Sequence, residues 1–305
     1  MHKTIARELN HQGYAVVPGF LSAGDASPAL LDFLAKAEKF FDGVIGDIPS
    51  AEMQGIKQKI EALIPGVADQ MGLSINKESY GYCSIRIQEA HGASVLRQPF
   101  DIHRDPKIAP GGVLNWHLDH FSYYLHGDHK NWLICYMPVM KPSKALTNLA
   151  IIPTHVVKTL DPESWRRIEG RGAMRFRCVE ADTIDWFKMR FPGQAIGVGD
   201  WFAVDDYDDA TMGWKMAFDL EKEKVVPELE VNDLLIMRAD VIHRTHDAGS
   251  DRISIRCDAV PSHAPRRGTL LGLAALTLRY PFVGAKRRYN LRAWLKKAWR
   301  QRLMR

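Results

Sequence analysis

Beyond about residue 80 the sequence consists of short apolar runs separated by turn residues. Each run has the length and the β-branched or aromatic content of a strand. Many short strands with turns between them favour a barrel or a jelly roll of two sheets. We therefore predict a mainly β fold with flanking helices. The predicted strands are 82–88, 133–139, 149–152, 202–204, 234–237 and 253–257.

The residues before this β region carry helical signals. We predict a helix over 5–11, followed by a turn and a short strand over 14–17. A second helix should begin near Pro28, because proline is favoured in the first turn of a helix. A third is expected over about 51–71, and Pro65 should break or kink it.

A long stretch from about 156 to 230 interrupts the β pattern and is acid-rich at 205–209. An insertion of this size in a β core is often a lid or a substrate-binding element. We expect one domain over 1–265 that contains this lid-like insertion, and a separate extension over 266–305.

The extension is strongly basic. Residues 261–305 hold twelve Lys or Arg and no Asp or Glu, which leaves the remaining chain with 29 basic and 36 acidic residues, a net charge of −7. This distribution points to a local acidic partner for the extension and not to nucleic acid. Five apolar residues fall on one helical face there. They are Leu291, Trp294, Leu295, Ala298 and Trp299.

Two interpretations of this basic helix remain open. It could contact a membrane surface peripherally through residues 286–305, or pack on the acidic body or on a second subunit. The N-terminus lacks the apolar run of a signal peptide, and the sequence has no spanning segment. We expect a cytoplasmic protein, which on the first interpretation would lie peripherally at the inner face of a membrane.

His117 and Asp119 are the strongest local signal for chemistry. Two residues apart on a strand, their side chains would point to the same side. Imidazole nitrogen and carboxylate oxygen together suit Fe(II), and a third ligand from a distant strand completes a facial triad with open coordination positions. A second pair with this spacing, His103 and Asp105, is expected in a loop.

His243 is the third ligand that we expect, with His246 as its rival. The strand that follows carries Arg252, Ser254 and Arg256. The planar fork of an arginine pairs with a carboxylate through two hydrogen bonds. A dicarboxylate could therefore lie between the metal and Arg252 or Arg256.

Four motifs occur in the order of a known family. They are LNHQGYAVVPGFL at 9–21, WHLDH at 116–120, TNLAIIPTH at 147–155, and Asp233 with His243 ahead of the Arg-x-Ser strand. Over about residues 5–260 the chain resembles the phytanoyl-CoA dioxygenase family of Fe(II)/2-oxoglutarate oxygenases. Asn232, Leu149 and Thr154 stand where that family usually has glycine.

The resemblance implies a double-stranded β-helix, a jelly-roll or cupin-like core, with Fe(II) at its mouth and 2-oxoglutarate as cosubstrate with O2. Such an enzyme would hydroxylate an unactivated C–H of a small or conjugated metabolite and release succinate and CO2. The implied metal ligands are His117, Asp119 and His243. The implied cosubstrate contacts are Tyr136, Arg252, Ser254 and Arg256.

Asp119 favours hydroxylation over halogenation, because a halogenase needs that coordination position for chloride. Two other functions stay open. The chain could be a metal-stabilised β-barrel that binds a ligand without catalysis. It could also be a zinc hydrolase, since two histidines and a carboxylate suit zinc as well. The substrate and the oligomeric state do not follow from the sequence.

Overall fold

The structure is a computed structural model. It describes residues 1–22, 24–36, 44–45, 53–75, 81–87, 116–118, 130–172, 174–205, 213–246, 252–259 and 261–262. Asp119, the pair of His103 and Asp105, and the basic extension over 266–305 lie outside these ranges. Within them, every helix is too short or too polar to span a bilayer.

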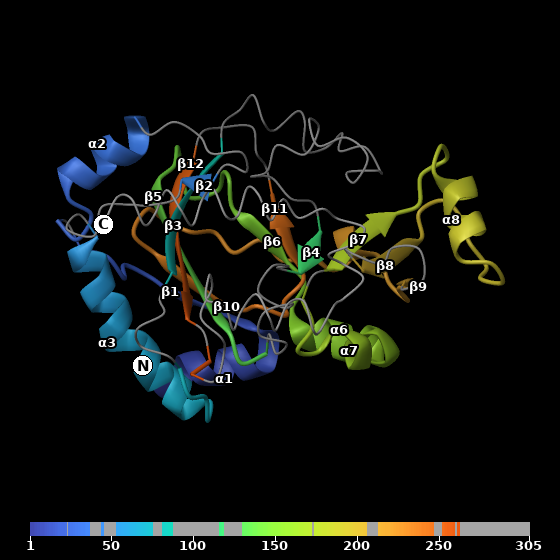
Figure 1. Cartoon of the computed structure of the whole chain (residues 1–305), viewed down its shortest axis with the longest axis horizontal. Coiled ribbons are helices and arrows are strands. Elements are labelled where there is room, and N and C mark those ends of the chain that lie inside the picture. Colours follow the sequence, from blue (N-terminus) through green and yellow to red (C-terminus); the bar gives the residue numbers. More distant parts are fainter. Residues whose placement is uncertain are drawn as a thin grey trace, which may run out of the picture.

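Among these residues, two antiparallel sheets of six strands each form the body of the molecule (Figure 1). The first sheet has the order β1 (Tyr14–Val17), β10 (Leu234–Arg238), β5 (Leu133–Met140), β12 (Arg252–Ala259), β3 (Gly81–Ile87) and β2 (Val44–Ile45). The second has the order β6 (Leu149–Ile151), β11 (His243–Thr245), β4 (His117–Leu118), β7 (Met174–Cys178), β8 (Trp201–Asp205) and β9 (Gly213–Lys215).

The central strands alternate between the two sheets as the chain proceeds. β3, β5, β10 and β12 belong to the first sheet, while β4, β6 and β11, which lie between them in sequence, belong to the second. An isolated bridge between Ile151 and Val225 adds one more strand position beside β6. This alternation winds the chain into a double-stranded β-helix. The predicted fold class is therefore confirmed.

β5 shows why the sequences of these strands are continuous apolar runs. Leu133, Cys135 and Met137 belong to the core between the first sheet and the N-terminal helices. Ile134 and Tyr136 belong to a separate core that also contains residues of the second sheet. Because successive side chains alternate faces, a strand covered on both sides needs apolar residues at almost every position.

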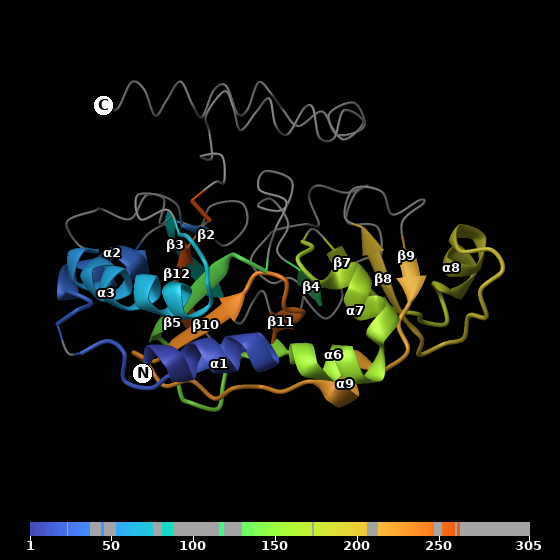
Figure 2. The ribbon, with the colours of Figure 1, turned by 90° about the horizontal axis from the view of Figure 1, so that it is seen from below.

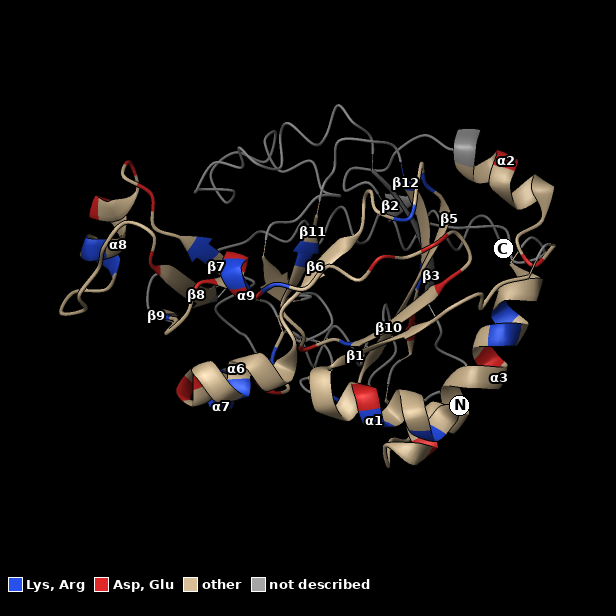
Figure 3. Ribbon diagram, turned by 180° about the vertical axis from the view of Figure 1, so that it is seen from behind, with Lys and Arg blue, Asp and Glu red and all other residues tan. Residues whose placement is uncertain are grey.

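Helices cover the outer faces of both sheets. Against the first sheet pack α1 (His2–Gln12), α2 (Pro28–Lys36) and α3 (Gln54–Gln70). Against the second pack α6 (Thr154–Leu160), α7 (Pro162–Ile168) and the short α9 (Leu220–Glu223), and α1, α6 and α9 lie along one side of the molecule in Figure 2. Charges of both signs lie on α1, α3, α7 and α8 (Ile184–Arg190), as Figure 3 shows.

α3 continues through Pro65, so the break expected at this proline does not occur. A proline inside a helix costs about 3 kcal/mol, because one hydrogen bond is lost and the ring meets the preceding turn. Ile60, Ile64 and Val67 are fully buried on the side of α3 that faces the core. Burial of each contributes about 1.5–3 kcal/mol, and together they exceed the cost of the proline.

The segment 156–230, expected as a lid-like insertion, also extends the second sheet. It supplies β7, β8 and β9, which continue the sheet beyond β4. Met174 and Phe176 on β7 are buried under α7, while Arg175 and Arg177 alternate with them. α8 lies at the far end of this extension in Figure 1.

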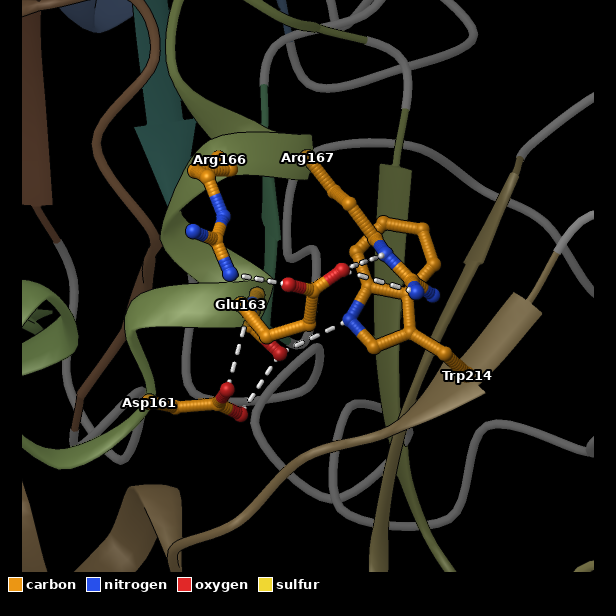
Figure 4. A network of polar contacts seen from close by, with 6 residues as sticks. Asp161, Glu163, Arg166, Arg167 and Trp214 are labelled. Carbon is orange, nitrogen blue, oxygen red and sulfur yellow. Dashed lines mark hydrogen bonds and ion pairs between the residues drawn. The ribbon is translucent and has the colours of Figure 1, made fainter.

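Asp161 joins α7 to the chain after β9. Its Oδ1 accepts a hydrogen bond from the Ser164 amide at 2.9 Å, which caps the helix. Its Oδ2 accepts from Ser164 Oγ at 2.5 Å and from the Ala217 amide at 2.8 Å. The Trp214 indole donates to Ser164 Oγ at 2.8 Å (Figure 4). One buried carboxylate therefore caps α7 and joins it to the segment that contains β9.

Asp161→Ala should lower the free energy of unfolding by about 2–3 kcal/mol, because a cap is lost and buried donors lose their acceptor. Urea unfolding monitored by circular dichroism measures this. The matched control is Glu163→Ala on the same helix, whose carboxylate forms exposed ion pairs with Arg166 and Arg167. The control should keep the wild-type midpoint, and an Asp161→Ala midpoint equal to that of the control contradicts the assignment.

Candidate functional site

Two imidazoles meet on the inner face of the second sheet. His117 on β4 and His243 on β11 are direct cross-strand partners. Their ring centroids lie 4.3 Å apart, and the side chains are 5% and 6% exposed. Their chain neighbours Trp116, Leu118 and Ile242 belong to the apolar cluster between the second sheet and the helices α7 and α9, which we call the outer core. Since side chains alternate along a strand, both imidazoles face the space between the sheets.

The hydrogen bond of His243 fixes which ring nitrogen carries the proton. Its Nδ1 lies 2.9 Å from the backbone oxygen of Val241. A carbonyl oxygen only accepts, so Nδ1 is the donor, and in the neutral ring Nε2 then carries the lone pair. Metal-binding histidines usually donate their other N–H to such a carbonyl or to a carboxylate. The side chain of His243 is therefore prepared to bind a metal through Nε2.

The structure brings together two of the three predicted metal ligands. Asp119, the third, lies outside the described residues and remains a prediction. Across the described ranges, no three His, Cys, Asp or Glu side chains gather into a group that could hold a metal. The rival His246 follows the last residue of β11, and its amide donates to the Asn148 oxygen at 2.9 Å. The position opposite His117 belongs to His243 and not to His246.

Arg252 is the most deeply buried charge near this pair. It begins β12 and is 1% exposed. Its Nη1 donates to the backbone oxygen of Thr147 and lies 3.4 Å from that of Asn148. Its guanidinium lies 5.4 Å from the centroid of the Tyr136 ring. Burial lowers the pKa of this arginine, which nonetheless stays charged at neutral pH because its ordinary pKa is so high.

No carboxylate among the described residues pairs with Arg252, and its Nε has no hydrogen-bond partner there. Burial of a charge without an opposite charge costs several kcal/mol. Thr147 Oγ1 is also buried without a partner, and the φ of Thr147 is 53°. A left-handed backbone is costly for a β-branched residue and is typical of ligand sites. The surroundings of Arg252 are suited to an anion.

Tyr136 and Ser254 lie beside Arg252 on the first sheet. Ser254 Oγ donates to the Tyr136 hydroxyl at 2.5 Å, and both side chains are buried. Burial raises the pKa of Tyr136, although the nearby guanidinium and the Ser254 hydrogen bond oppose this. Arg256, the other predicted anchor, already donates to Asp258 through Nε at 2.8 Å. Of the two arginines, the geometry favours Arg252 as the anion contact.

Strand register places this arginine near the histidines. His243 lies opposite Ile151 in the pairing of β11 with β6. Arg252 contacts the backbone oxygens of Thr147 and Asn148, which precede Ile151 by four and three residues. At about 3.3 Å per residue, the contact lies within roughly 10–13 Å of the pair along the sheet. A five-carbon dicarboxylate that bridges a metal and a guanidinium fits that scale.

The motif at Asn232 and Asp233 shapes the turn before β10. Asn232 has a φ of 79°, a left-handed conformation that asparagine tolerates better than most residues. This explains how it can replace glycine. Asp233 accepts hydrogen bonds from the amides of Gly19 and Glu230, both at 2.8 Å. In this chain the aspartate ties the loop after β1 to the start of β10.

Sequence reasoning did not single out Lys141. Its Nζ donates to Asn148 Oδ1 and to the Leu229 oxygen, both at 2.7 Å. Burial and the charge of Arg252 lower its pKa to about 8. The amine fixes the turn whose backbone oxygens accept from Arg252. No local pattern indicates this, because Leu229 is 88 residues away in sequence.

No protein-family model and no curated protein matches the chain by sequence. Its fold resembles several solved structures. One is SnoN, an α-ketoglutarate-dependent non-haem epimerase from nogalamycin biosynthesis, with 15% identity, 90% of this chain and 88% of that chain covered, and a TM-score of 0.48.

A second is SnoK, the carbocyclase of the same biosynthesis, with 11% identity, 88% and 87% coverage and a TM-score of 0.47. A third is EctD from S. alaskensis, solved with 2-oxoglutarate and 5-hydroxyectoine, with 10% identity, 86% and 77% coverage and a TM-score of 0.45. Similarity at this level assigns no reaction or substrate to this chain.

His117→Ala and His243→Ala should each weaken Co(II) binding by about 100-fold or more, since loss of an outer partner alone typically costs 10–100-fold. A Co(II) titration followed by visible absorption measures this. His11→Ala is the control, because this exposed imidazole lies on α1 and stacks on His155. Wild-type affinity in both site variants would exclude the pair as ligands.

Proposed function

We propose that this chain is a non-haem oxygenase that uses Fe(II), O2 and 2-oxoglutarate to oxidise an unactivated C–H group. The observation that carries the proposal is Arg252. Its buried guanidinium has no carboxylate partner among the described residues and lies on the inner face near two paired imidazoles. A cation held in this way suits a cosubstrate carboxylate.

The residues present fit the metal and the cosubstrate. His117 and His243 would hold Fe(II) together with Asp119, a ligand set that leaves positions open. The guanidinium of Arg252 would receive the distal carboxylate of 2-oxoglutarate, beside the hydroxyls of Tyr136 and Ser254. Fe(II) and 2-oxoglutarate, when bound, supply the oxidising chemistry with O2 and release succinate and CO2.

The chain itself would orient the metal-binding and cosubstrate-binding side chains and enclose them. The Val241 carbonyl keeps the proton of His243 on Nδ1, and the carbonyls at Thr147 and Asn148 hold the guanidinium in place. The apolar core between the two sheets keeps water away from these groups. Electrostatic interactions are stronger in such a site than in water.

The substrate class is a further part of the proposal. The order of the four motifs supports a place near the phytanoyl-CoA dioxygenase family, and Asp119 supports hydroxylation. The basic extension over 266–305 supports a conjugated substrate, such as a lipid- or sugar-linked metabolite at a membrane surface. A zinc hydrolase would not need the buried Arg252, and a ligand-binding barrel would show no turnover.

Asp119→Ala should abolish the 2-oxoglutarate-dependent release of succinate, because the metal would lose its carboxylate ligand. Succinate is quantified after aerobic incubation with Fe(II), 2-oxoglutarate and a panel of candidate substrates. Circular dichroism verifies that the variant is folded. Turnover at the wild-type rate in the variant contradicts the proposal, and so does a wild-type protein that releases no succinate across the panel.

Arg252→Lys should raise the KM for 2-oxoglutarate about 10- to 100-fold, because the loss of a charge-assisted bidentate contact costs about 1.5–3 kcal/mol. Arg256→Lys is the matched variant on the same strand, and its partner Asp258 can still pair with lysine. Its KM should stay within about twofold of wild type. The reverse pattern would assign the cosubstrate to Arg256.

A further inference from the structure

Glu221 on α9 lies behind the histidine pair, on the outer face of the second sheet. Its Oε1 accepts a hydrogen bond from the Trp116 indole at 2.6 Å. Its Oε2 accepts from Arg244 Nη2 at 2.9 Å and from Lys224 Nζ at 2.7 Å. One carboxylate thus receives three donors from three different parts of the chain.

Two of these donors are the chain neighbours of the predicted metal ligands. Trp116 precedes His117, and Arg244 follows His243. The guanidinium of Arg244 also lies 5.1 Å from the centroid of the Trp116 ring. Side chains alternate along strands. Glu221 therefore binds an outward side chain on each strand, and the adjacent residues His117 and His243 point inward.

Within the described residues, the backbone pairs these two strands at one position. β4 has two residues and β11 has three, and their described pairing consists of the single register pair His243 and His117. Side-chain contacts that connect the two strands add to this backbone pairing in restraining the strand separation.

The carboxylate is ionised at neutral pH. Partial burial by itself would raise the pKa of Glu221, but hydrogen bonds from Lys224, Arg244 and Trp116 outweigh burial and lower the pKa to about 2. Hydrogen bonds to an ionised acceptor are shorter and stronger than neutral ones. Glu221 therefore binds both strands through charge-assisted contacts.

We propose that Glu221 is a positioning residue, which fixes the separation of His117 and His243 from the opposite face of the sheet and thereby sets the affinity of the site for metal. The inference rests on the proposed function, because it takes the two histidines as ligands. Groups that hydrogen-bond a metal-binding imidazole directly contribute about 10- to 100-fold to affinity, and Glu221, which acts through the adjacent residues Trp116 and Arg244, should contribute less.

Co(II) binding to the full chain tests this through affinity and through the visible ligand-field spectrum at saturation. Glu221→Ala should weaken binding by up to about 10-fold, the lower end of the effect of a direct ligand partner, and change the spectrum. Glu221→Gln keeps an acceptor oxygen and should fall between Glu221→Ala and wild type, and it covers the case in which the alanine variant does not fold. Lys222→Ala is the control, since the side chain of this exposed neighbour on α9 lies 3.9 Å from Asp219 and forms no hydrogen bond or ion pair with Glu221, Trp116 or Arg244 among the described residues.

The outcomes separate the two proposals. If wild type binds Co(II) and folded Glu221 variants bind it with unchanged affinity and spectrum, the positioning assignment is overturned while the metal site stands. A lower melting temperature with unchanged Co(II) binding also overturns it, because that result shows a structural contribution only. If wild type binds no Co(II), both proposals fail.

Discussion

Within the described residues, β4 and β11 meet at one register pair, His117 opposite His243, and this pairing places both imidazoles in the space between the sheets. Trp116 and Arg244 point outward from the same strands, into contacts with Glu221. A slip of one residue would exchange the two sets. The imidazoles would then lie in the outer core, and an arginine and a tryptophan would fill the space between the sheets. The apolar cover by α7 and α9 opposes that exchange.

The first sheet contributes the other half of the site. Arg252 and Ser254 on β12 contact Tyr136 on β5, and the guanidinium reaches across to the turn before β6. A β-helix whose strands alternate between sheets brings these groups together, although Tyr136 and Arg252 are more than a hundred residues apart in sequence. Burial of a guanidinium without an opposite charge costs free energy, and an anionic cosubstrate bound beside it would offset that cost.

Local pattern predicted much of the fold. The strand predicted over 14–17 has the expected bounds, and the strand predicted over 133–139 is one residue longer in the structure, Leu133–Met140. These segments alternate in polarity or are apolar throughout, so the sequence pattern of a strand can be recognised in them. Of the break or kink expected at Pro65, the break does not occur, because the local sequence does not report the tertiary burial of the neighbouring residues. β7 was not predicted, since its five residues lie within a region of mixed composition.

Fewer of the contacts at the candidate site than of the strands could be predicted from the sequence. His117, His243 and Arg252 stand in motifs with recognisable spacing. Glu221 and Lys141 stand in none, because their partners come from distant segments that only the folded chain brings together. A sequence pattern reports what is near in the chain or periodic, and the contacts of Glu221 with Trp116 and of Lys141 with Leu229 are neither.

Anaerobic absorption spectroscopy of the Fe(II)-loaded protein tests the central claim most directly. Addition of 2-oxoglutarate should produce a weak visible charge-transfer band, because the 2-oxo acid would chelate a metal that has open positions. Succinate, which lacks the 2-oxo group, should produce none. If iron binds and 2-oxoglutarate gives no band, Arg252 is not a cosubstrate anchor and the chain is not a 2-oxoglutarate oxygenase.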